Sequence, residues 1–568
     1  MRRQLLSLAA ALLLLGGCAT PAPIRTSVAP PSAPAGMVSA PDPRAAVAGA
    51  EMLRQGGSAA DAALATIVAL TVVEPQSSGI GGGGFLVYSD EGAAPVTYDG
   101  RETAPMAAGP YWFLRDGKPM ETREAVPSGK SVGVPGNLGL MALAHRDQGR
   151  LPWAELFRPG IQLARNGFAI TPRLHRFLIR NKKTGALSEQ GRALFYDAAG
   201  NPLPVGTIVR NAELAAFLER LAAQGPDAFY VGPNAQAIVA TVNGTRENRS
   251  QMALGDLASY EAKQRPAVCG EYRRHRICGM GPPASGGITV FAIVKQLERF
   301  DLAALGPQSA TAWHLIAESM RLAFADRGHY LADPDFVPVP VAGLTDPGYL
   351  ASRSALIAPD RTLAKVAAGV PPGAPRVVSG VQPAETGTSH LVVVDRWGDV
   401  ASLTSTIESL FGSGLVINGY YLNNELTDFS FVPFRDGVPV ANRVEPGKRP
   451  RSSMSPTIVY GPDGRVRLAV GAGGGANIIA QVVRSIIAVI DWNLTAQQAI
   501  ELPVLFAPAD TVQVEEGSAL ETMVPQLRAL GHEVQSRELP IKGNAIEWRD
   551  GRWVGAADPR TEGVVVSE

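Results

Sequence analysis

The sequence predicts a mixed α/β fold in which helices cover sheets on either side. Helical periodicity extends over residues 37–75 and over much of residues 130–330, whereas short β-branched segments predominate from residue 388 to about 472. Strands and helices then alternate towards the C-terminus. Because both kinds of element have apolar surface to bury, this order indicates a layered α/β sandwich.

The first 36 residues predict an export signal followed by a tether. Arg2 and Arg3 precede an apolar run over residues 5–15, which is typical of a secretory signal and too short to span a bilayer. Leu15-Gly16-Gly17-Cys18 resembles a bacterial lipobox, in which Cys18 is lipidated; the alternative is a plain signal peptide with an incidental cysteine. We therefore assign residues 1–18 as a lipoprotein-type signal peptide and residues 19–36, rich in Pro and Ala, as a flexible tether. The expected location is the periplasm or cell envelope, with the lipid as the only membrane attachment.

Two Ala-rich helices are predicted next, over Pro43–Gly56 and Ser58–Val73. Gly81–Gly84 then precede a predicted strand, Phe85–Tyr88, which indicates close approach of backbone or of a ligand. A phosphate-binding loop is disfavoured because neither a helix nor a Lys-Ser/Thr pair follows. Further helices are predicted near residues 134–147, 153–166, 174–181, 211–224 and 307–331.

Two cysteines lie in the mature part of the sequence, Cys269 and Cys278. An exported protein can form a disulfide between them across a turn at Tyr272-Arg273-Arg274, and the alternative is a pair of buried thiols. Neither cysteine has a His or Cys at metal-ligand spacing, so no metal site is predicted. The 52 basic and 52 acidic side chains balance, which gives no footprint for nucleic acid.

A hairpin is predicted around residue 395. Residues 331–387, rich in Pro and Gly, are expected to cross the surface and to end at Gly387-Thr388. An apolar strand follows to Asp395, and a turn at Gly398-Asp399 returns the chain through a second strand that ends at Thr406. Thr388 and Thr406 thus place two hydroxyls at the mouth of the hairpin.

The remainder predicts a helix over Asn477–Ile490, directly after Gly473-Gly474-Gly475, and shorter helices over Thr495–Glu501 and Met523–Leu530. Strands are expected near residues 512–515, 534–537, 545–548 and 553–556.

An ordered series of motifs extends over the chain from about residue 37 onwards. The motifs are Ser78-Gly79-Ile80-Gly81-Gly82-Gly83-Gly84-Phe85, Arg101-Glu102-Thr103-Ala104-Pro105, Pro282-Pro283-Ala284-Ser285-Gly286-Gly287, Phe324-Ala325-Asp326-Arg327, Asp333-Pro334-Asp335-Phe336, Thr388-Ser389-His390, Leu422-Asn423-Asn424-Glu425-Leu426-Thr427-Asp428-Phe429 and the segment from Lys448 to Thr457. This series resembles the gamma-glutamyltransferase (gamma-glutamyltranspeptidase) family of N-terminal-nucleophile hydrolases. The resemblance implies a four-layer αββα sandwich.

The resemblance implies that Thr388 is the nucleophile, activated by its own free α-amine after the Gly387-Thr388 bond is cut. The precursor would yield a large subunit, residues 37–387, and a small subunit, residues 388–568, which stay together as a heterodimer. The substrates implied are glutathione or another γ-glutamyl compound and an amino acid or peptide acceptor. No metal or organic cofactor is implied.

Other site residues follow from the same resemblance. Thr406 would bond to the nucleophile, and the N–H groups of Gly474 and Gly475 would hold the oxyanion. Arg101, Ser452 and Ser453 would bind the substrate α-carboxylate, because a guanidinium fork matches a planar carboxylate. Glu425 and Asp428 would receive the α-ammonium, which needs compensating charge when it is stripped of water.

Two departures from the family pattern leave the substrate open. Glu408 stands where Asn is common and would add negative charge beside Glu425 and Asp428. The segment from Phe431 to Gly447, where many members carry a lid, is short. The alternatives are a cephalosporin or glutaryl acylase, a poly-γ-glutamate transferase, or an uncleaved surface lipoprotein without activity.

Overall fold

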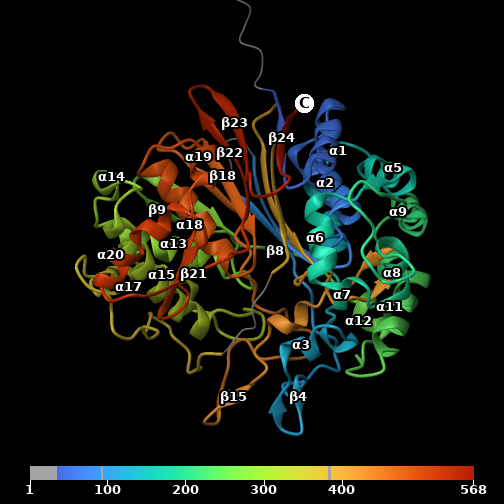
Figure 1. The fold of residues 1–568 in the computed structure, drawn as a ribbon, viewed down its shortest axis with the longest axis horizontal. Coiled ribbons are helices and arrows are strands. Elements are labelled where there is room, and N and C mark those ends of the chain that lie inside the picture. Colours follow the sequence, from blue (N-terminus) through green and yellow to red (C-terminus); the bar gives the residue numbers. More distant parts are fainter. Residues whose placement is uncertain (1–34, 91–93, 381–385) are drawn as a thin grey trace, which may run out of the picture. The chain divides into compact units, whose positions relative to one another are not determined.

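Two antiparallel sheets form the centre of the computed structural model, which describes residues 35–90, 94–380 and 386–568 (Figure 1). The seven-stranded sheet has the order β24 (Val564–Ser567), β1 (Met37–Ala40), β11 (Ser389–Val394), β12 (Val400–Thr406), β2 (Gly83–Ser89), β3 (Val96–Gly100) and β8 (Lys263–Arg265). The six-stranded sheet has the order β23 (Arg552–Ala557), β22 (Lys542–Arg549), β18 (Val466–Gly473), β17 (Thr457–Tyr460), β10 (His275–Gly279) and β9 (Val268–Tyr272).

The two sheets pack face to face through β11, which contacts β18 and β22 of the other sheet. Val392 and Val394 join the core that includes the six-stranded sheet, whereas Leu391 and Val393 join the core on the opposite side. Successive side chains of a strand point to opposite faces, so a strand buried on both faces must be apolar throughout. The continuous apolar run of this strand has that cause.

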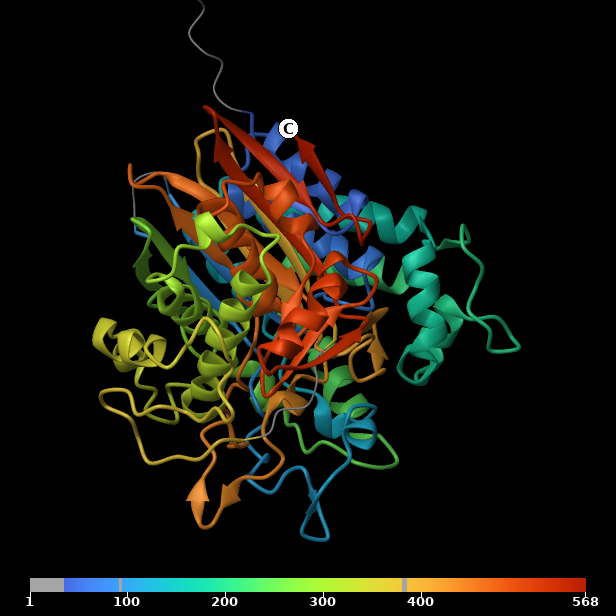
Figure 2. The ribbon, with the colours of Figure 1, turned by 60° about the vertical axis from the view of Figure 1, so that its left-hand side comes forward.

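Helices form the two outer layers, and the four-layer αββα prediction is confirmed. One layer, over the seven-stranded sheet, contains α1 (Pro43–Arg54), α2 (Ala59–Val73), α4 (Asn137–Gln148), α5 (Arg158–Asn166) and α9 (Ala212–Gln224). The other contains α13 (Gly286–Leu297), α15 (Ala310–Tyr330), α18 (Asn477–Ile490) and α19 (Ala496–Glu501). Figure 2 shows the blue and teal helices on one side of the strands and the green helices on the other.

Smaller elements connect these layers. The helices are α3 (Thr122–Ala125), α6 (Pro172–Arg180), α7 (Lys182–Gly185), α8 (Glu189–Phe195), α10 (Asp227–Tyr230), α11 (Pro233–Asn243), α12 (Leu254–Ala258), α14 (Leu302–Leu305), α16 (Val341–Leu344), α17 (Pro347–Ser354) and α20 (Val524–Ala529), with 3₁₀ turns η1 (Gly129–Ser131), η2 (Trp153–Phe157), η3 (Glu425–Asp428) and η4 (Ala519–Met523). The strands are β4 (Leu114–Arg115), β5 (Lys118–Pro119), β6 (Phe168–Ala169), β7 (Ile208–Val209), β13 (Val416–Ile417), β14 (Tyr420–Tyr421), β15 (Phe434–Arg435), β16 (Val438–Pro439), β19 (Leu505–Phe506), β20 (Thr511–Glu515) and β21 (Glu533–Arg537).

The glycine run before β2 serves close backbone approach. A Cβ at Gly82 would lie 1.9 Å from the Thr406 carbonyl oxygen, and one at Gly81 would lie 2.1 Å from the Tyr421 carbonyl oxygen. Only glycine fits at such distances. These residues therefore bring β2 against the end of β12, where Thr406 lies.

The structure corrects two sequence-based expectations. The helical prediction for residues 37–75 is wrong at its start, because Met37–Ala40 form β1, paired with β11 and β24. Four residues are too few to show a period, and pairing on both edges decides their conformation. The segment 331–387 does not simply cross the surface: α17 lies within it, and Leu350 and Ile357 are buried in the core.

Cys269 and Cys278 form a disulfide between directly opposed positions of β9 and β10. The segment predicted as a short lid contains the β15–β16 hairpin, and its Phe434 ring lies 6.2 Å from the ring of Tyr111. The signal peptide, Cys18 and tether residues 19–34 lie outside the described residues. No helix among the residues that the structure describes is both long and apolar enough to cross a membrane.

Candidate active site

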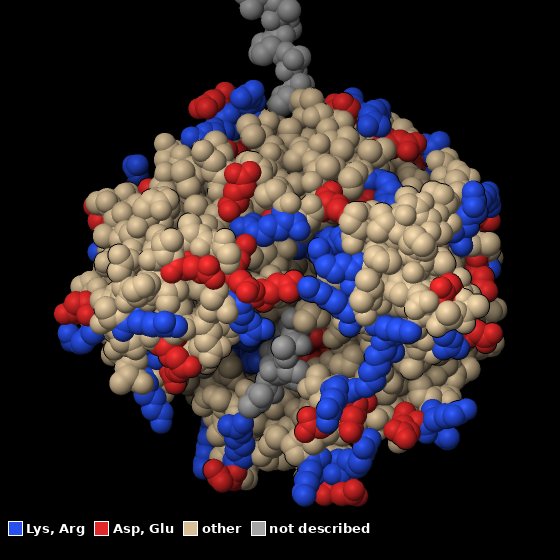
Figure 3. Space-filling view, in the orientation of Figure 1, with Lys and Arg blue, Asp and Glu red and all other residues tan. Residues whose placement is uncertain are grey.

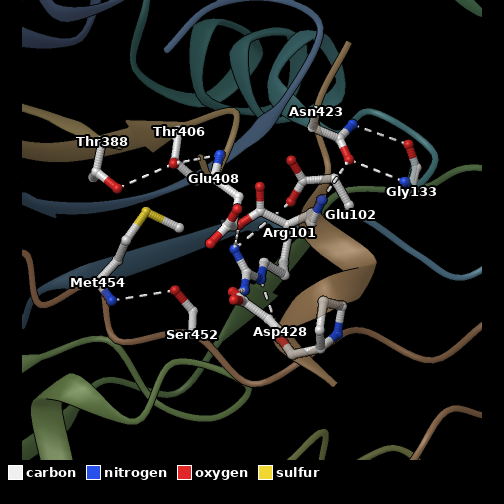
Figure 4. A network of polar contacts seen from close by, with 12 residues as sticks. Arg101, Glu102, Gly133, Thr388, Thr406, Glu408, Asn423, Asp428, Ser452 and Met454 are labelled. Carbon is white, nitrogen blue, oxygen red and sulfur yellow. Dashed lines mark hydrogen bonds and ion pairs between the residues drawn. The ribbon is translucent and has the colours of Figure 1, made fainter. Parts of the chain in front are cut away.

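Thr388 lies directly before β11, where its hydroxyl faces the end of β12 (Figure 4). Its Oγ1 donates a hydrogen bond of 3.0 Å to Thr406 Oγ1, and the latter also accepts from the Glu408 N–H at 2.8 Å. The glycine run described above leaves room for Thr406 at this point. The two hydroxyls at the mouth of the hairpin are thus brought together and oriented by backbone.

The peptide bond before Thr388 is held from three sides. The Gly387 carbonyl oxygen accepts from the Gly474 N–H at 3.1 Å, the Gly387 N–H donates to the Glu408 carbonyl at 2.7 Å, and the Thr388 N–H donates to the Ser77 carbonyl at 3.1 Å. A Cβ at Gly387 would lie 2.0 Å from the Glu408 carbonyl oxygen. Only glycine therefore fits on the N-terminal side of this bond.

Thr388 has a φ of +96°, a region that β-branched residues avoid. Such a conformation costs on the order of 1–3 kcal/mol and persists only where the surroundings enforce it. Here the three backbone hydrogen bonds enforce it. The strain is located at the junction that the sequence singled out.

Gly474 and Gly475 lie between β18 and α18, with φ values of +119° and +62°. A Cβ at Gly474 would lie 2.3 Å from the Pro540 carbonyl oxygen. The turn therefore needs glycine, and it directs the Gly474 N–H at the Gly387 carbonyl. An N–H held in this way can stabilise negative charge that develops on a carbonyl oxygen.

Lys542 and Glu74 form a buried ion pair behind Thr388, which the sequence did not predict. Lys542 Nζ lies 2.5 Å from the Glu74 carboxylate, 3.0 Å from Ser389 Oγ and 3.2 Å from the Thr388 carbonyl oxygen. Burial lowers the pKa of Lys542 to about 8 although Glu74 opposes the shift. Burial alone would raise the pKa of Glu74, but Lys542 and Arg173 outweigh it and lower that pKa. Lys542 is the first residue of β22, and no local sequence pattern indicated its partner.

A second group of polar side chains surrounds Arg101, directly after β3 (Figure 4). Its guanidinium pairs with the carboxylates of Glu425 and Asp428 on η3. It also donates to the carbonyls of Pro450 and Arg451, each at 3.1 Å. Arg101 therefore joins the acids to the segment that carries the two predicted serines.

Asn423 holds η3 in place. Its side chain accepts from the backbone N–H groups of Gly133 and Glu425 and donates to the carbonyls of Gly81 and Gly133, all within 2.9–3.0 Å. The glycine run is thus tied to the acids as well as to Thr406. The sequence identified Asn423 only as part of a motif and predicted no role for it.

Several carboxyl groups lie around the single guanidinium of Arg101. Glu102, which sequence reasoning missed although it follows Arg101 directly, is fully buried 3.9 Å from that guanidinium. Burial raises the pKa of Glu102 to about 8 against the opposing effect of Arg101. Burial and the neighbouring acids, including Glu408, raise the pKa of Glu425 well above its usual value. At neutral pH the group therefore retains protons, as expected for carboxyls crowded around one charge.

Glu408 lies at this site with a φ of +74°. Its carboxylate accepts hydrogen bonds from Ser409 Oγ and Asn424 Nδ2. Two neutral side chains thus hold this carboxyl group in place.

Ser452 and Ser453 are positioned by an arginine that sequence reasoning did not assign to the site. Arg327 on α15 donates to Ser453 Oγ at 2.6 Å and to Ser285 Oγ at 2.8 Å. Ser285 in turn donates to the Ser452 carbonyl at 2.6 Å, and the Met454 N–H donates to Ser452 Oγ at 3.2 Å. The motif Phe324-Ala325-Asp326-Arg327 was the available signal.

One group of described residues has metal-ligand side chains within reach of one another: His314, Glu318 and His532. The two imidazoles are hydrogen-bonded at 2.6 Å, and His314 also bonds to the Ala358 carbonyl at 2.7 Å. Glu318 pairs with Arg321 at 2.6 Å. Both ring nitrogens of His314 and Nε2 of His532 are therefore hydrogen-bonded, whereas His532 Nδ1 has no hydrogen-bond partner among the described residues and lies 3.9 Å from Glu318. Arg321 already pairs with that carboxylate.

Comparisons with known proteins agree on one family. The family model described as Gamma-glutamyltranspeptidase matches residues 45–567. The chain is 36% identical to a glutathione hydrolase proenzyme of Bacillus subtilis (strain 168) and to one of Escherichia coli (strain K12), in each case over 94% of this chain and 91% of that protein. It is also 36% identical to an acylase ACY 1 proenzyme of Pseudomonas sp. (strain SE83), over 95% of this chain and 94% of that protein.

Solved structures agree with this result. A cephalosporin acylase from Bacillus halodurans aligns with a TM-score of 0.83 and 26% identity over 98% of this chain and 99% of that one. A gamma-glutamyltranspeptidase chain from Helicobacter pylori aligns with a TM-score of 0.55 and 34% identity over 57% of this chain and 91% of that one. With the motif series, the αββα fold and the family match in agreement, the chain belongs to the gamma-glutamyltranspeptidase family.

Proposed function

We propose that the protein is a gamma-glutamyltransferase and glutathione hydrolase that cleaves itself between Gly387 and Thr388 and uses Thr388 as its nucleophile. The observation that carries the proposal is the hydrogen bond from the Gly474 N–H to the Gly387 carbonyl oxygen, beside the Thr388–Thr406 hydroxyl pair. A polarised carbonyl next to an oriented hydroxyl is the arrangement that acyl transfer needs.

In self-cleavage, Thr388 Oγ1 attacks the Gly387 carbonyl carbon. The carbonyl oxygen becomes an oxyanion held by the Gly474 N–H, the C–N bond breaks, and the released nitrogen takes up a proton to become the free α-amine of Thr388. Water then hydrolyses the Gly387 ester. The products are a large subunit that ends at Gly387 and a small subunit, residues 388–568.

In turnover, the new α-amine takes the proton of the Thr388 hydroxyl as that oxygen attacks the γ-carbonyl of the donor. Gly474 and Gly475 stabilise the oxyanion, and the leaving amine departs with a proton. The γ-glutamyl ester on Thr388 then passes to water or to the amine of an amino acid or peptide. None of these steps calls for a metal or organic cofactor.

In the structure Arg101 and the acids pair with each other, and the charged groups of the donor would replace these partners. Its α-carboxylate takes a place at the Arg101 guanidinium and accepts from Ser452 and Ser453. Its α-ammonium compensates Glu425 and Asp428, with Glu408 nearby. A zwitterionic donor therefore fits a pocket in which acids exceed cations, because its ammonium group lies against carboxyl groups that otherwise retain protons.

The decisive experiment is a denaturing gel of purified wild type and Thr388→Ala, with glutathione turnover measured beside it. We expect two fragments and release of glutamate and cysteinylglycine from wild type, and one inactive chain from the variant. Thr388→Ser, which keeps a hydroxyl, should cleave slowly. A wild type that persists as one chain would contradict the proposal.

A second candidate is an acylase, because acylase relatives match as well as the hydrolases do and Glu408 changes the pocket. Against it, a glutaryl group has no α-ammonium for the acids to bind. A γ-glutamyl amide and the matching glutaryl amide differ only in that amine. Faster hydrolysis of the glutaryl amide would favour the acylase.

We also propose that Cys18 carries a lipid that tethers the enzyme in the periplasm or cell envelope. Only the lipobox-like segment Leu15–Cys18 supports this step. Cys18→Ala should move the protein from the membrane fraction to the soluble fraction of lysed cells. Equal membrane association of both forms would exclude the anchor.

A further inference from the structure

A cavity of about 560 Å³ opens beside the Gly387-Thr388 bond, and no residue of the Arg101 group lines it. Gly387, Thr388 and Gly474 line it, so it reaches the reacting bond. Its volume lies within the range of small-molecule sites. The site residues already assigned to the γ-glutamyl group do not line it, and the cavity is therefore available to the other half of the substrate.

The lining is rich in cations. They are Arg173, Arg176, Arg180, Arg537, Lys542 and Arg560, against the carboxylates of Glu515, Glu516 and Glu538. Figure 3 shows blue and red side chains close together in the middle of the face of the molecule that it draws.

Four of the six cations already have carboxylate partners. Arg173 and Lys542 pair with Glu74, Arg180 pairs with Glu538, and Arg560 pairs with Glu515 and Asp558. Arg176 and Arg537 are exposed, and within the described part of the chain no ion pair or hydrogen bond engages their guanidinium groups. These two arginines are therefore free to bind an anion.

Helix α6 presents its arginines as a stripe. Arg173, Arg176, Phe177 and Arg180 are spaced i, i+3, i+4 and i+7 and line the cavity, while Leu174 and Leu178 are buried on the other face. Like charges at such spacings destabilise a helix by a few tenths of a kcal/mol per pair. An anionic ligand in the cavity would offset that repulsion.

We propose that this cavity is the subsite for the leaving group and the acceptor, and that Arg176 and Arg537 bind a carboxylate on that group. The inference rests on the proposed function, because it assumes that the γ-glutamyl half occupies the Arg101 side. The ligand class is an amino acid or short peptide with a free C-terminal carboxylate. Guanidinium groups suit this anion because their paired N–H donors match its two oxygens.

The test uses two donors that differ only in that carboxylate, γ-glutamylglycine and γ-glutamylglycinamide. Glutamate release is measured for wild type, for Arg176→Gln/Arg537→Gln and for Arg361→Gln, a matched control at an exposed arginine outside the cavity. We expect wild type to favour the carboxylate donor in kcat/KM by about tenfold and the double variant to lose about five- to tenfold of that preference. The control should keep the wild-type ratio.

Salt provides a second measurement that needs no variant. The preference of wild type for the carboxylate donor should fall between 20 and 500 mM NaCl, values chosen to span strong and weak screening at roughly 20 Å to 4 Å Debye length. A ratio near one in wild type, or an unchanged ratio in the double variant, would overturn the inference while glutamate release from either donor upholds the proposed function. If neither donor releases glutamate, it is the proposed function that fails.

Discussion

The contacts of Lys542 show how much depends on one side chain behind Thr388, the proposed nucleophile. It is the only group among the described hydrogen-bond donors that joins the Thr388 carbonyl, Ser389 and Glu74 at one atom. Because it contacts the backbone of Thr388 and not the proposed reacting hydroxyl, we regard it as a positioning residue rather than a catalytic one. Its contacts fix where Thr388 lies relative to the Gly474 N–H.

Lys542→Met should both destabilise the protein and slow self-cleavage. Removing one partner of a buried ion pair costs about 3–5 kcal/mol, because the remaining charge is left poorly compensated. Adding Glu74→Gln removes that charge and should restore much of the melting temperature. Cleavage, followed on gels over time, should stay slow in the double variant, because the donor to the Thr388 carbonyl is still missing. Full recovery of cleavage together with stability would show that Lys542 is purely structural.

The proton on Glu102 predicts a pH dependence of stability. Its pKa is raised by burial from 4.5 to about 8, so between these values the folded protein keeps a proton that the unfolded chain has released. The contribution is therefore fully present below pH 4.5 and is lost as the pH rises towards 8, at no more than about 1.4 kcal/mol per pH unit.

Glu102→Gln stays neutral throughout, so its stability relative to wild type should improve as the pH rises from 5 to 8. Thermal melting of both proteins across this range measures the difference. Glu189→Gln, at an exposed position of α8, is the control and should follow wild type. Parallel curves for Glu102→Gln and wild type would show that the carboxyl is ionised in the fold.

At the scale of elements, the long helices and the central hairpin could be predicted because their patterns repeat. The helix Asn477–Ile490 was predicted to the residue, and the hairpin from Ser389 to Thr406 followed from two β-branched runs around a Gly turn. Strand β1 could not be predicted, because its four residues owe their conformation to partners about 350 and 530 positions away.

The candidate site was likewise hard to predict where its contacts join positions that are distant in the sequence. Glu102 and Arg327 lie within quoted motifs, but their roles, like that of Lys542, depend on neighbours distant in sequence. Lys542 and Glu74 are 468 residues apart. A local sequence pattern cannot indicate an ion pair between residues so far apart in the chain.

The N-terminal cap of helix α2 allows a prediction of how much stability a helix loses with its cap. Every residue of this helix is buried, and Ser58 and Asp61 form a capping box at its start. Asp61 also accepts from the Arg150 and Leu151 N–H groups at 2.8 and 3.1 Å. Asp61→Ala therefore leaves three N–H groups without their acceptor.

We expect Asp61→Ala to cost about 2–4 kcal/mol, because one buried and two partly buried N–H donors lose a charge-assisted bond. The measurement is thermal melting in the Thr388→Ala background, which keeps one chain and avoids subunit dissociation. Glu189→Ala, an exposed acid in the first turn of α8, should change stability by no more than about 0.5 kcal/mol. Equal shifts for the two alanine variants would exclude a special role for the cap.

At the scale of the whole described unit, the two proposed subunits are interleaved. In the seven-stranded sheet β1 lies between β24 and β11, and β12 pairs with β2, so strands from before and after Gly387 alternate. In the six-stranded sheet β17 pairs with β10 across the same division. Separation would break four strand pairings and expose both cores.

The cleaved enzyme should therefore remain one particle in native buffer but refold differently from the uncleaved chain. Cleavage leaves every native contact in place, so gel filtration of wild type and Thr388→Ala should give the same elution volume. After denaturation the two fragments must find each other, which makes refolding bimolecular, whereas Thr388→Ala refolds within one chain. The refolded fraction of wild type, measured by recovered native fluorescence, should fall as the protein is diluted over a hundredfold range, and that of Thr388→Ala should not. Dissociation in native buffer, or refolding of the cleaved pair that is independent of concentration, would be incompatible with interleaved subunits.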